Sequence, residues 1–191
     1  TILVLLQPDL GTSLVLFGIW FGYLLVSELP LRHIAVAFLA FILIGFLAWN
    51  FGLADYQKER IAALFSPGTD PLGINYSVLQ SKIAIGSAGF FGKGFGQGAQ
   101  VQLGFLPAAK TDFIFSAFVE EWGLLGGLLV ITAFFYLIYR ILQLGMRSYN
   151  NFAKFVSLGT AITFFIHFSV NLGSALGLLP VIGISLPLVS Y

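Results

Sequence analysis

Residues 113–139 read FIFSAFVEEWGLLGGLLVITAFFYLIY, a run that is apolar apart from two adjacent acids. A helix needs about 20 apolar residues to cross a hydrocarbon core of about 30 Å, so this run predicts a membrane span. Comparable runs predict three more spans, at residues 1–26, 34–53 and 155–172. The expected fold is therefore all-α, a polytopic transmembrane helical bundle forming a single membrane domain.

The composition supports a bilayer environment. Hydrophobic residues make up 58% of the chain and charged residues 9%, whereas soluble domains are usually about a quarter charged. The formal net charge of +1 argues against a nucleic-acid partner, which requires a basic face, so membrane lipids are the expected surroundings. The absence of cysteine excludes disulfides and thiolate chemistry.

Both ends of the chain lie in apolar sequence. Thr1 stands inside an apolar run, and residues 177–191, rich in Gly and Pro, resemble the start of a final broken span. These features predict a fragment of a longer membrane protein.

Basic residues predict the orientation. Arg140 and Arg147 lie after the third span, with Lys154 just beyond and no acid between them. Short cytoplasmic loops are enriched in Lys and Arg, so this turn is expected inside. Alternation then places residues 55–112 outside as a long loop. Within it, residues 75–85 carry apolar side chains at helical spacing, which predicts a short interfacial helix.

The glycine-rich stretch from Gly86 to Gly98 has two superficial likenesses to nucleotide sites. It lacks the P-loop spacing and has Gly94 where Ser or Thr is required, and it lacks the context of a dinucleotide fold. We therefore expect tightly turned backbone beside the membrane surface. His33 and His167 have no carboxylate at ligand spacing, so a zinc site is not expected.

Four ionisable residues fall within the predicted spans, where lipid cannot solvate them: Asp9, Glu120, Glu121 and His167. Asp9 is expected either to cap a helix or to contact a substrate or ion. The two glutamates are expected either to pair with a basic residue of another span or to have a functional role. For His167 the alternatives are a neutral ring hydrogen-bonded between helices and a functional group.

Asp112 stands where the long loop meets the third span. One interpretation makes it a helix-capping acid that satisfies free backbone N–H groups. The other makes it a catalytic carboxylate at the membrane interface. On a continuous helix, Glu120 would lie about 12 Å deeper than this interface.

Several motifs together resemble one family. They are QPDLGTSL at 7–14, NYSVLQSKIAIGSAGFFGKGFGQG at 75–98, FLPAAKTDFIFSAFVEEWGLLGG at 105–127 and GLLPVIGISLPLVSY at 177–191. In this order they resemble the SEDS family, the RodA and FtsW cell-wall polymerases, and the RodA branch in particular. The resemblance covers nearly the whole chain.

The resemblance implies a peptidoglycan glycosyltransferase that polymerises lipid II during cell-wall elongation. It would be a multi-pass protein of the bacterial cytoplasmic (inner) membrane, with a class B penicillin-binding protein as partner. The essential acid of the family's TDF motif falls on Asp112, the expected general base. The family often has acids where this chain has Gly104 and Ala108, and His where it has Lys110. A fragment lacking about the first half of the family's spans is expected to be inactive alone.

The leaving group of such a reaction is a lipid diphosphate, whose charge needs cations. The candidates are Arg60, Lys82, Lys93 and Lys110, with Gln80 and Ser81 as hydrogen-bonding groups for sugar or diphosphate. A divalent cation, Mg²⁺ or Mn²⁺, could also bridge Asp112 to phosphate. No other cofactor is expected.

The sequence is also compatible with two other functions. The polar residues within the spans, with breaks at Pro8 and Pro180, would also suit a flippase or transporter of a lipid-linked cell-wall precursor. The third alternative is a scaffold that recruits a penicillin-binding protein without catalysis.

Overall fold

The computed structural model describes residues 10–26, 29–52, 55–65 and 75–190. Every regular element in these ranges is a helix, which confirms the all-α prediction. The elements are α2 (Leu10–Val26), α3 (Leu31–Leu47) continued by the π-helix η1 (Ala48–Gly52), α4 (Asp55–Phe65), α5 (Tyr76–Ser87), α6 (Ala99–Gln102), α7 (Ile114–Arg147) and α8 (Asn151–Ala175). Three helical stretches, 31–52, 114–147 and 151–175, are long and apolar enough to cross a membrane.

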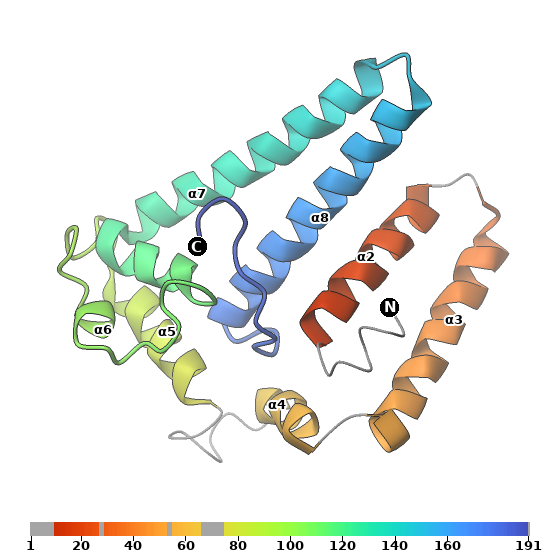
Figure 1. Ribbon diagram of the computed structural model, residues 1–191. Coiled ribbons are helices and arrows are strands. Elements are labelled where there is room, and N and C mark those ends of the chain that lie inside the picture. The colour runs from red at the N-terminus through yellow and green to blue at the C-terminus, as the bar shows by residue number, and fades with distance from the viewer. Residues whose placement is uncertain (1–9, 27–28, 53–54, 66–74, 191) are drawn as a thin grey trace.

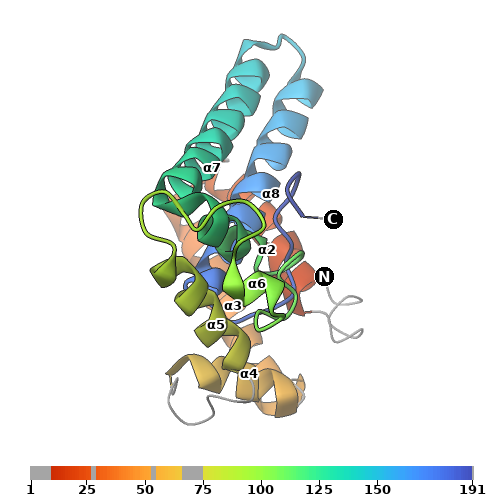
Figure 2. The ribbon, with the colours of Figure 1, turned by 90° about the vertical axis from the view of Figure 1, so that its left-hand side faces the viewer.

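The long helices lie side by side in the order α7, α8, α2 and α3 (Figure 1). Helices α7 and α8 form an antiparallel pair, because only residues 148–150 separate them. The short helices α5 and α6 lie beside the start of α7, and α4 lies beyond them, at the end opposite the α7–α8 turn (Figure 2). The segment between the second and third spans therefore collects at one end of the bundle.

The buried core lies between α7 and α8 and is completed by the C-terminal segment, residues 176–190. Phe134 of α7 and Phe168 of α8 stack with ring centroids 5.0 Å apart, and Leu186 of the C-terminal segment is buried beside them. A second cluster joins α5, α7 and α8 around Phe113, Phe115 and Ala175. These contacts fix the end of the bundle at which α7 begins and α8 ends.

Small residues bring α2 close to α8. A Cβ on Gly18 would lie 2.5 Å from Ile166 Cδ1, and one on Gly22 would lie 2.8 Å from Ile162 Cδ1. Close backbone approach through small residues is a common way to pack helices in membranes. Helix α3 buries none of its described side chains and meets α2 through aromatic pairs such as Phe17–Phe41.

Two departures from the predicted elements involve charged residues. The third span was predicted to end at Tyr139, but α7 continues to Arg147, so Arg140 and Arg147 lie on the helix rather than in a turn. The extension follows from good helix formers such as Leu, Gln, Met and Arg, and arginine can keep its charged head in water beyond the hydrocarbon. The charge-rich residues 55–60, expected only as loop, begin helix α4.

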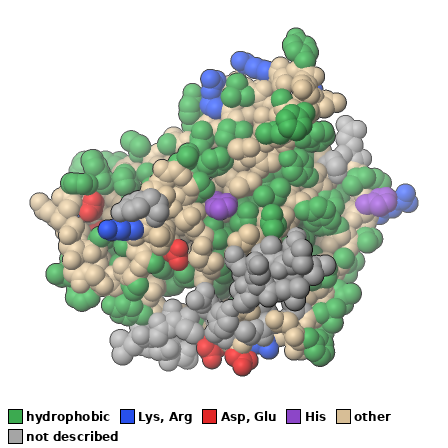
Figure 3. All heavy atoms as spheres, viewed as in Figure 1, with side chains coloured by type: hydrophobic (Ala, Val, Ile, Leu, Met, Phe, Trp, Pro, Cys, Tyr) green, Lys and Arg blue, Asp and Glu red, His purple; other side chains and the backbone are tan. Residues whose placement is uncertain are grey.

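Hydrophobic side chains are spread over the long helices, and Lys and Arg lie at the end where α7 turns into α8 (Figure 3). Exposed Leu, Ile and Phe side chains cover both α3 and α7. A face of this kind suits lipid rather than water. The clustering of basic residues agrees with the predicted cytoplasmic side, which stays a prediction.

Candidate functional site at the start of α7

Asp112 lies two residues before the first residue of α7, at the tip of a tight turn. Ala108 adopts φ of 50°, and its carbonyl accepts hydrogen bonds from the amides of Thr111 at 3.1 Å and Phe113 at 3.2 Å. Phe113 occupies the N-cap position and is 2% exposed. The turn and the buried ring of Phe113 together fix the position of Asp112 just before the start of α7. Asp112 itself is half-buried.

The backbone of Asp112 is tied to two other elements by Asn171 of α8. The Asn171 Nδ2 atom donates to the carbonyl oxygens of Asp112 at 3.0 Å and Ile184 at 2.9 Å. The side chain is buried, and both bonds are made by its nitrogen, whereas Oδ1 has no hydrogen-bond partner among the described atoms. Asn171 therefore joins the start of α7, the end of α8 and the C-terminal segment at one point.

Ser81 makes a similar junction one turn further along α7. Its Oγ lies 2.6 Å from Ser116 Oγ and donates to the carbonyl oxygen of Ala175 at 2.6 Å. Ser81 and Ser116 are both fully buried. The predicted contact of Ser81 with sugar or diphosphate does not suit this position, because its hydroxyl already holds α5 to α7 and α8. The neighbouring Gln80 is half-buried, and its predicted role stays untested.

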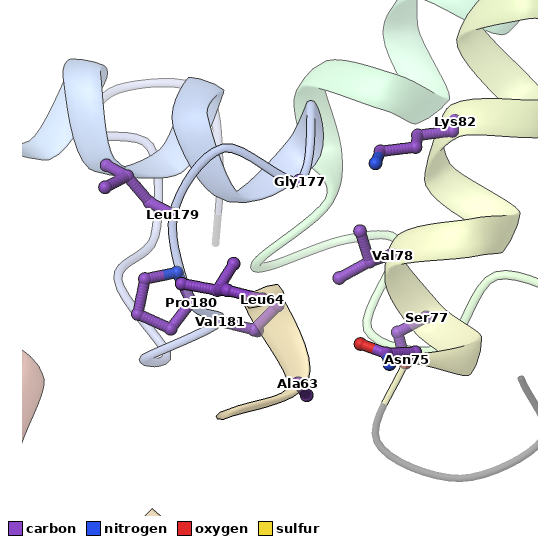
Figure 4. Close-up of a pocket in the computed structure, with 10 residues that line it drawn as sticks. All are labelled: Ala63, Leu64, Asn75, Ser77, Val78, Lys82, Gly177, Leu179, Pro180 and Val181. Atoms are coloured by element: carbon purple, nitrogen blue, oxygen red, sulfur yellow. The ribbon is translucent and has the colours of Figure 1, made fainter. Parts of the chain in front are cut away.

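A cavity of about 150 Å³ opens between α4, α5 and the turn after α8. It is lined by Ala63, Leu64, Asn75, Ser77, Val78, Lys82, Gly177, Leu179, Pro180 and Val181 (Figure 4). Lys82 reaches from α5 toward the turn at Gly177 (Figure 4). A Cβ on Gly177, whose φ is +68°, would lie 2.6 Å from Lys82 Nζ, so glycine leaves room for the ammonium group.

The cavity and Asp112 lie at the same end of the bundle. Residues 177–181 follow the C-terminal end of α8, and Asp112 precedes the start of its antiparallel partner α7. Lys82 makes no hydrogen bond or ion pair with the described residues. This end of the bundle thus combines a carboxylate, an uncommitted ammonium group and an apolar-lined hollow.

Glu120 and Lys93 form a salt bridge, with Oε1 and Nζ 2.7 Å apart. Their side chains are 0% and 30% exposed, respectively. The alternative in which Glu120 pairs with a basic residue of another span is wrong, because its partner lies in the glycine-rich loop instead. That loop lies against α7 in the folded protein, which the order of residues along the chain does not reveal. Glu121 is half-buried beside it.

The remaining predicted residues are dispersed. Lys110 is exposed before the turn that carries Asp112, and Arg60 lies on α4, with a side chain outside the described atoms. Asp9 also lies outside the described residues. His167 Nδ1 lies 3.3 Å from the carbonyl oxygen of Ser185, so its partner belongs to the C-terminal segment rather than to another helix.

In the described parts of the chain, no three His, Cys, Asp or Glu side chains are grouped so that they could hold a metal ion. Mg²⁺ at phosphate-transfer sites is commonly held by one or two carboxylates together with substrate phosphates. The described residues do not build a metal site of their own around Asp112.

Sequence reasoning missed the packing role of two polar residues. Ser116 bonds Ser81, and the amide of Gln100 donates to Glu120 Oε1 at 3.1 Å. Ser116 stands alone among apolar neighbours in residues 113–119, which is the signal that could have identified it. The contact of Gln100 is made by its backbone and has no signal in the sequence.

Comparisons with known proteins identify the family of this chain. The FtsW, RodA and SpoVE family model, described as cell cycle protein, matches residues 1–191. Peptidoglycan glycosyltransferase MrdB of Escherichia coli strain K12 is 43% identical over 191 residues, which cover all of this chain and 52% of that protein. Stage V sporulation protein E of Bacillus subtilis strain 168 is 36% identical, again over the whole chain and 51% of that protein.

A solved structure of a peptidoglycan synthase complex, described as coordinating polymerisation and crosslinking, has the same fold. It superposes with a TM-score of 0.75 at 36% identity, covering 99% of this chain and 52% of the solved chain. The chain thus spans about half the length of the relatives it matches. Because the family model covers every residue and the helical arrangement agrees, this chain belongs to the FtsW, RodA and SpoVE family of membrane proteins.

Proposed function

We propose that the complete polypeptide containing residues 1–191 is a peptidoglycan glycosyltransferase that polymerises lipid II during cell-wall elongation. The relatives named peptidoglycan glycosyltransferase MrdB support the activity, and the solved synthase complex supports a class B penicillin-binding protein as partner. The observation that carries the proposal is Asp112, presented at the head of α7 and tied through Asn171 to α8. In this proposal the reaction takes place at the outer face of the bacterial cytoplasmic membrane.

In the proposed reaction Asp112 acts as general base. Its carboxylate accepts the proton of the acceptor sugar hydroxyl while the hydroxyl oxygen attacks the anomeric carbon of a second lipid-linked sugar. A new carbon–oxygen bond forms, and the bond from the anomeric carbon to the diphosphate oxygen breaks. The electron pair leaves with the lipid diphosphate, so a fixed cation near that group lowers the barrier.

Lys82 is the cation that the described structure best suits to the diphosphate. Its ammonium group extends toward Gly177 beside a cavity lined by Val78, Leu179 and Pro180. A lipid diphosphate has an anionic head attached to an apolar chain, so an uncommitted ammonium beside apolar walls matches both parts. Two other residues predicted to contact the diphosphate, Lys93 and Ser81, already bond to groups within the protein.

Replacing Lys82 by Met should raise the KM for lipid II about tenfold, which corresponds to about 1.4 kcal/mol of lost binding. Arg at this position should restore most of the affinity, because it keeps the charge and can bind phosphate. Steady-state polymerisation rates at increasing lipid II concentration measure both values. Lys154→Met, an exposed change at the start of α8, is the matched control. An unchanged KM in Lys82→Met would remove this residue from the substrate site.

Reconstitution in liposomes tests the function itself. Lipid II is supplied in both leaflets, and its movement across the bilayer and its conversion to glycan are measured separately with the complete protein. Glycan formation is the expected result. Translocation without glycan would instead favour the flippase or transporter, and neither activity would favour the scaffold, provided that the protein still binds its penicillin-binding partner.

A further inference from the structure

Helix α7 is interrupted at Gly123, where φ is 73° and ψ is −175°. Such a break frees backbone carbonyls before it and backbone amides after it, and buried groups of this kind need partners. The glycine-rich loop supplies them. The amides of Lys93 and Gly94 donate to the carbonyls of Glu120 and Glu121, each at 3.0 Å.

The bonding also runs in the opposite direction. The amides of Leu124 and Leu125 donate to the carbonyls of Gly89 at 3.0 Å and Phe90 at 3.2 Å. Residues 89–94 therefore fit into the break and replace the bonds that α7 loses there. Contact is so close that a Cβ on Gly92 would lie 2.1 Å from the carbonyl oxygen of Glu121.

Glu120 adds a charged bond to this backbone junction. Its Oε1 accepts from Lys93 Nζ at 2.7 Å and from the amide of Gln100 at 3.1 Å. Its Oε2 is buried with no hydrogen-bond partner among the described atoms, and a Cβ on Gly98 would lie 2.8 Å from it. A fully buried carboxylate is very unfavourable without a paired cation, so the ammonium group of Lys93 is needed to balance the charge of Glu120.

Gln100, which binds Glu120, also connects to the segment that carries Asp112. The carbonyl of Gln100 accepts from the amide of Leu106 at 3.0 Å. Leu106 is buried in the cluster that also contains Phe113, the residue next to Asp112. Glu120 thus bonds the glycine-rich loop at Lys93 and helix α6 at Gln100, before the chain turns toward Asp112.

We propose that Glu120 and Lys93 are positioning residues, which lock the glycine-rich loop into the break of α7 and so hold the Asp112 segment in place. In this role the charge of Lys93 balances Glu120 and is not a contact for the lipid diphosphate. The proposal rests on the proposed function for its activity measurement. Its structural part does not depend on that function.

The test compares Lys93→Met, Glu120→Gln and the double variant in the complete protein with its partner. Lys93→Met leaves a buried charge unpaired, so glycan synthesis should fall at least about tenfold and protease should cleave residues 86–98 faster. The double variant removes both charges and should recover most of both properties. Glu120→Gln alone should lower kcat per folded molecule with little change in the KM for lipid II, as expected for a residue that positions the base.

Several results would overturn the proposal. If Lys93 instead contacts substrate, the double variant stays as impaired as Lys93→Met and both show a raised KM. If kcat per folded molecule is unchanged in Glu120→Gln, the residue stabilises the fold without positioning the base. Lys154→Met serves again as the lysine control. If the wild-type protein makes no glycan, the proposed function fails. Protease cleavage of the glycine-rich loop in the single and double variants still tests whether Lys93 and Glu120 hold this loop against α7.

Discussion

Replacing Asp112 by Asn should abolish glycan synthesis while the protein is made and inserted normally. The amide has nearly the same shape as the carboxylate but cannot accept the proton of the attacking hydroxyl. General-base catalysis contributes about 10² to 10⁴ in rate, so the product should fall below detection in an ordinary assay. Purified wild-type and variant complexes are compared by the amount of polymer formed from lipid II.

The tie between the backbone carbonyl of Asp112 and Asn171 does not involve the substituted group, so Asp112→Asn should keep this bond. Asp55→Asn on α4 removes an exposed acid from the same long segment and serves as the control. Normal polymer yield from Asp112→Asn would reject the catalytic role. Growth supported by the inactive variant would favour the scaffold alternative.

Replacing Gly123 by Ala should prevent accumulation of folded protein. The φ of 73° with ψ of −175° is a conformation that essentially only glycine adopts. A Cβ there would also lie 2.3 Å from the amide nitrogen of Gly92 and 2.4 Å from the carbonyl oxygen of Phe90. The strain and the overpacking each cost about 1–3 kcal/mol, a large share of the 5–15 kcal/mol that stabilises a typical protein.

The measurement is the yield of monodisperse detergent-solubilised protein and its thermal midpoint. Gly86→Ala is the matched control, since a Cβ at this exposed position in α5 would meet nothing within 4 Å. It should fold as well as the wild type or better, because alanine favours helix. Equal stability of the two variants would show that the break in α7 is not required.

Strong local patterns made the helices predictable. Long apolar runs locate α7 and α8, and the change to charge-rich and glycine-rich sequence locates the segment between the spans. Boundaries were less predictable, because hydropathy does not report where a helix extends past the membrane, as α7 does between Tyr139 and Arg147. The motif around Asp112 was also readable, since it is a contiguous string of residues.

Partners could not be predicted in the same way. One of the two expectations for Glu120 was a basic partner in another span, but it binds Lys93 from a loop that lies earlier in the chain. Ser81 was expected at a substrate, but it bonds Ser116 and Ala175 in the core. Both pairings depend on how the loop and α5 dock on α7, and contacts between distant segments leave little trace in local spacing.

By itself, the sequence determined that the protein belongs in a membrane, that it is helical and that its family motif places an acid at residue 112. These properties follow from apolar length and from contiguous motifs, both of which are local. The tertiary structure alone decided which lysine is neutralised within the fold and which faces a cavity. That difference depends on burial and on the groups within hydrogen-bonding distance, which exist only once α5, the glycine-rich loop and α8 are packed around the start of α7.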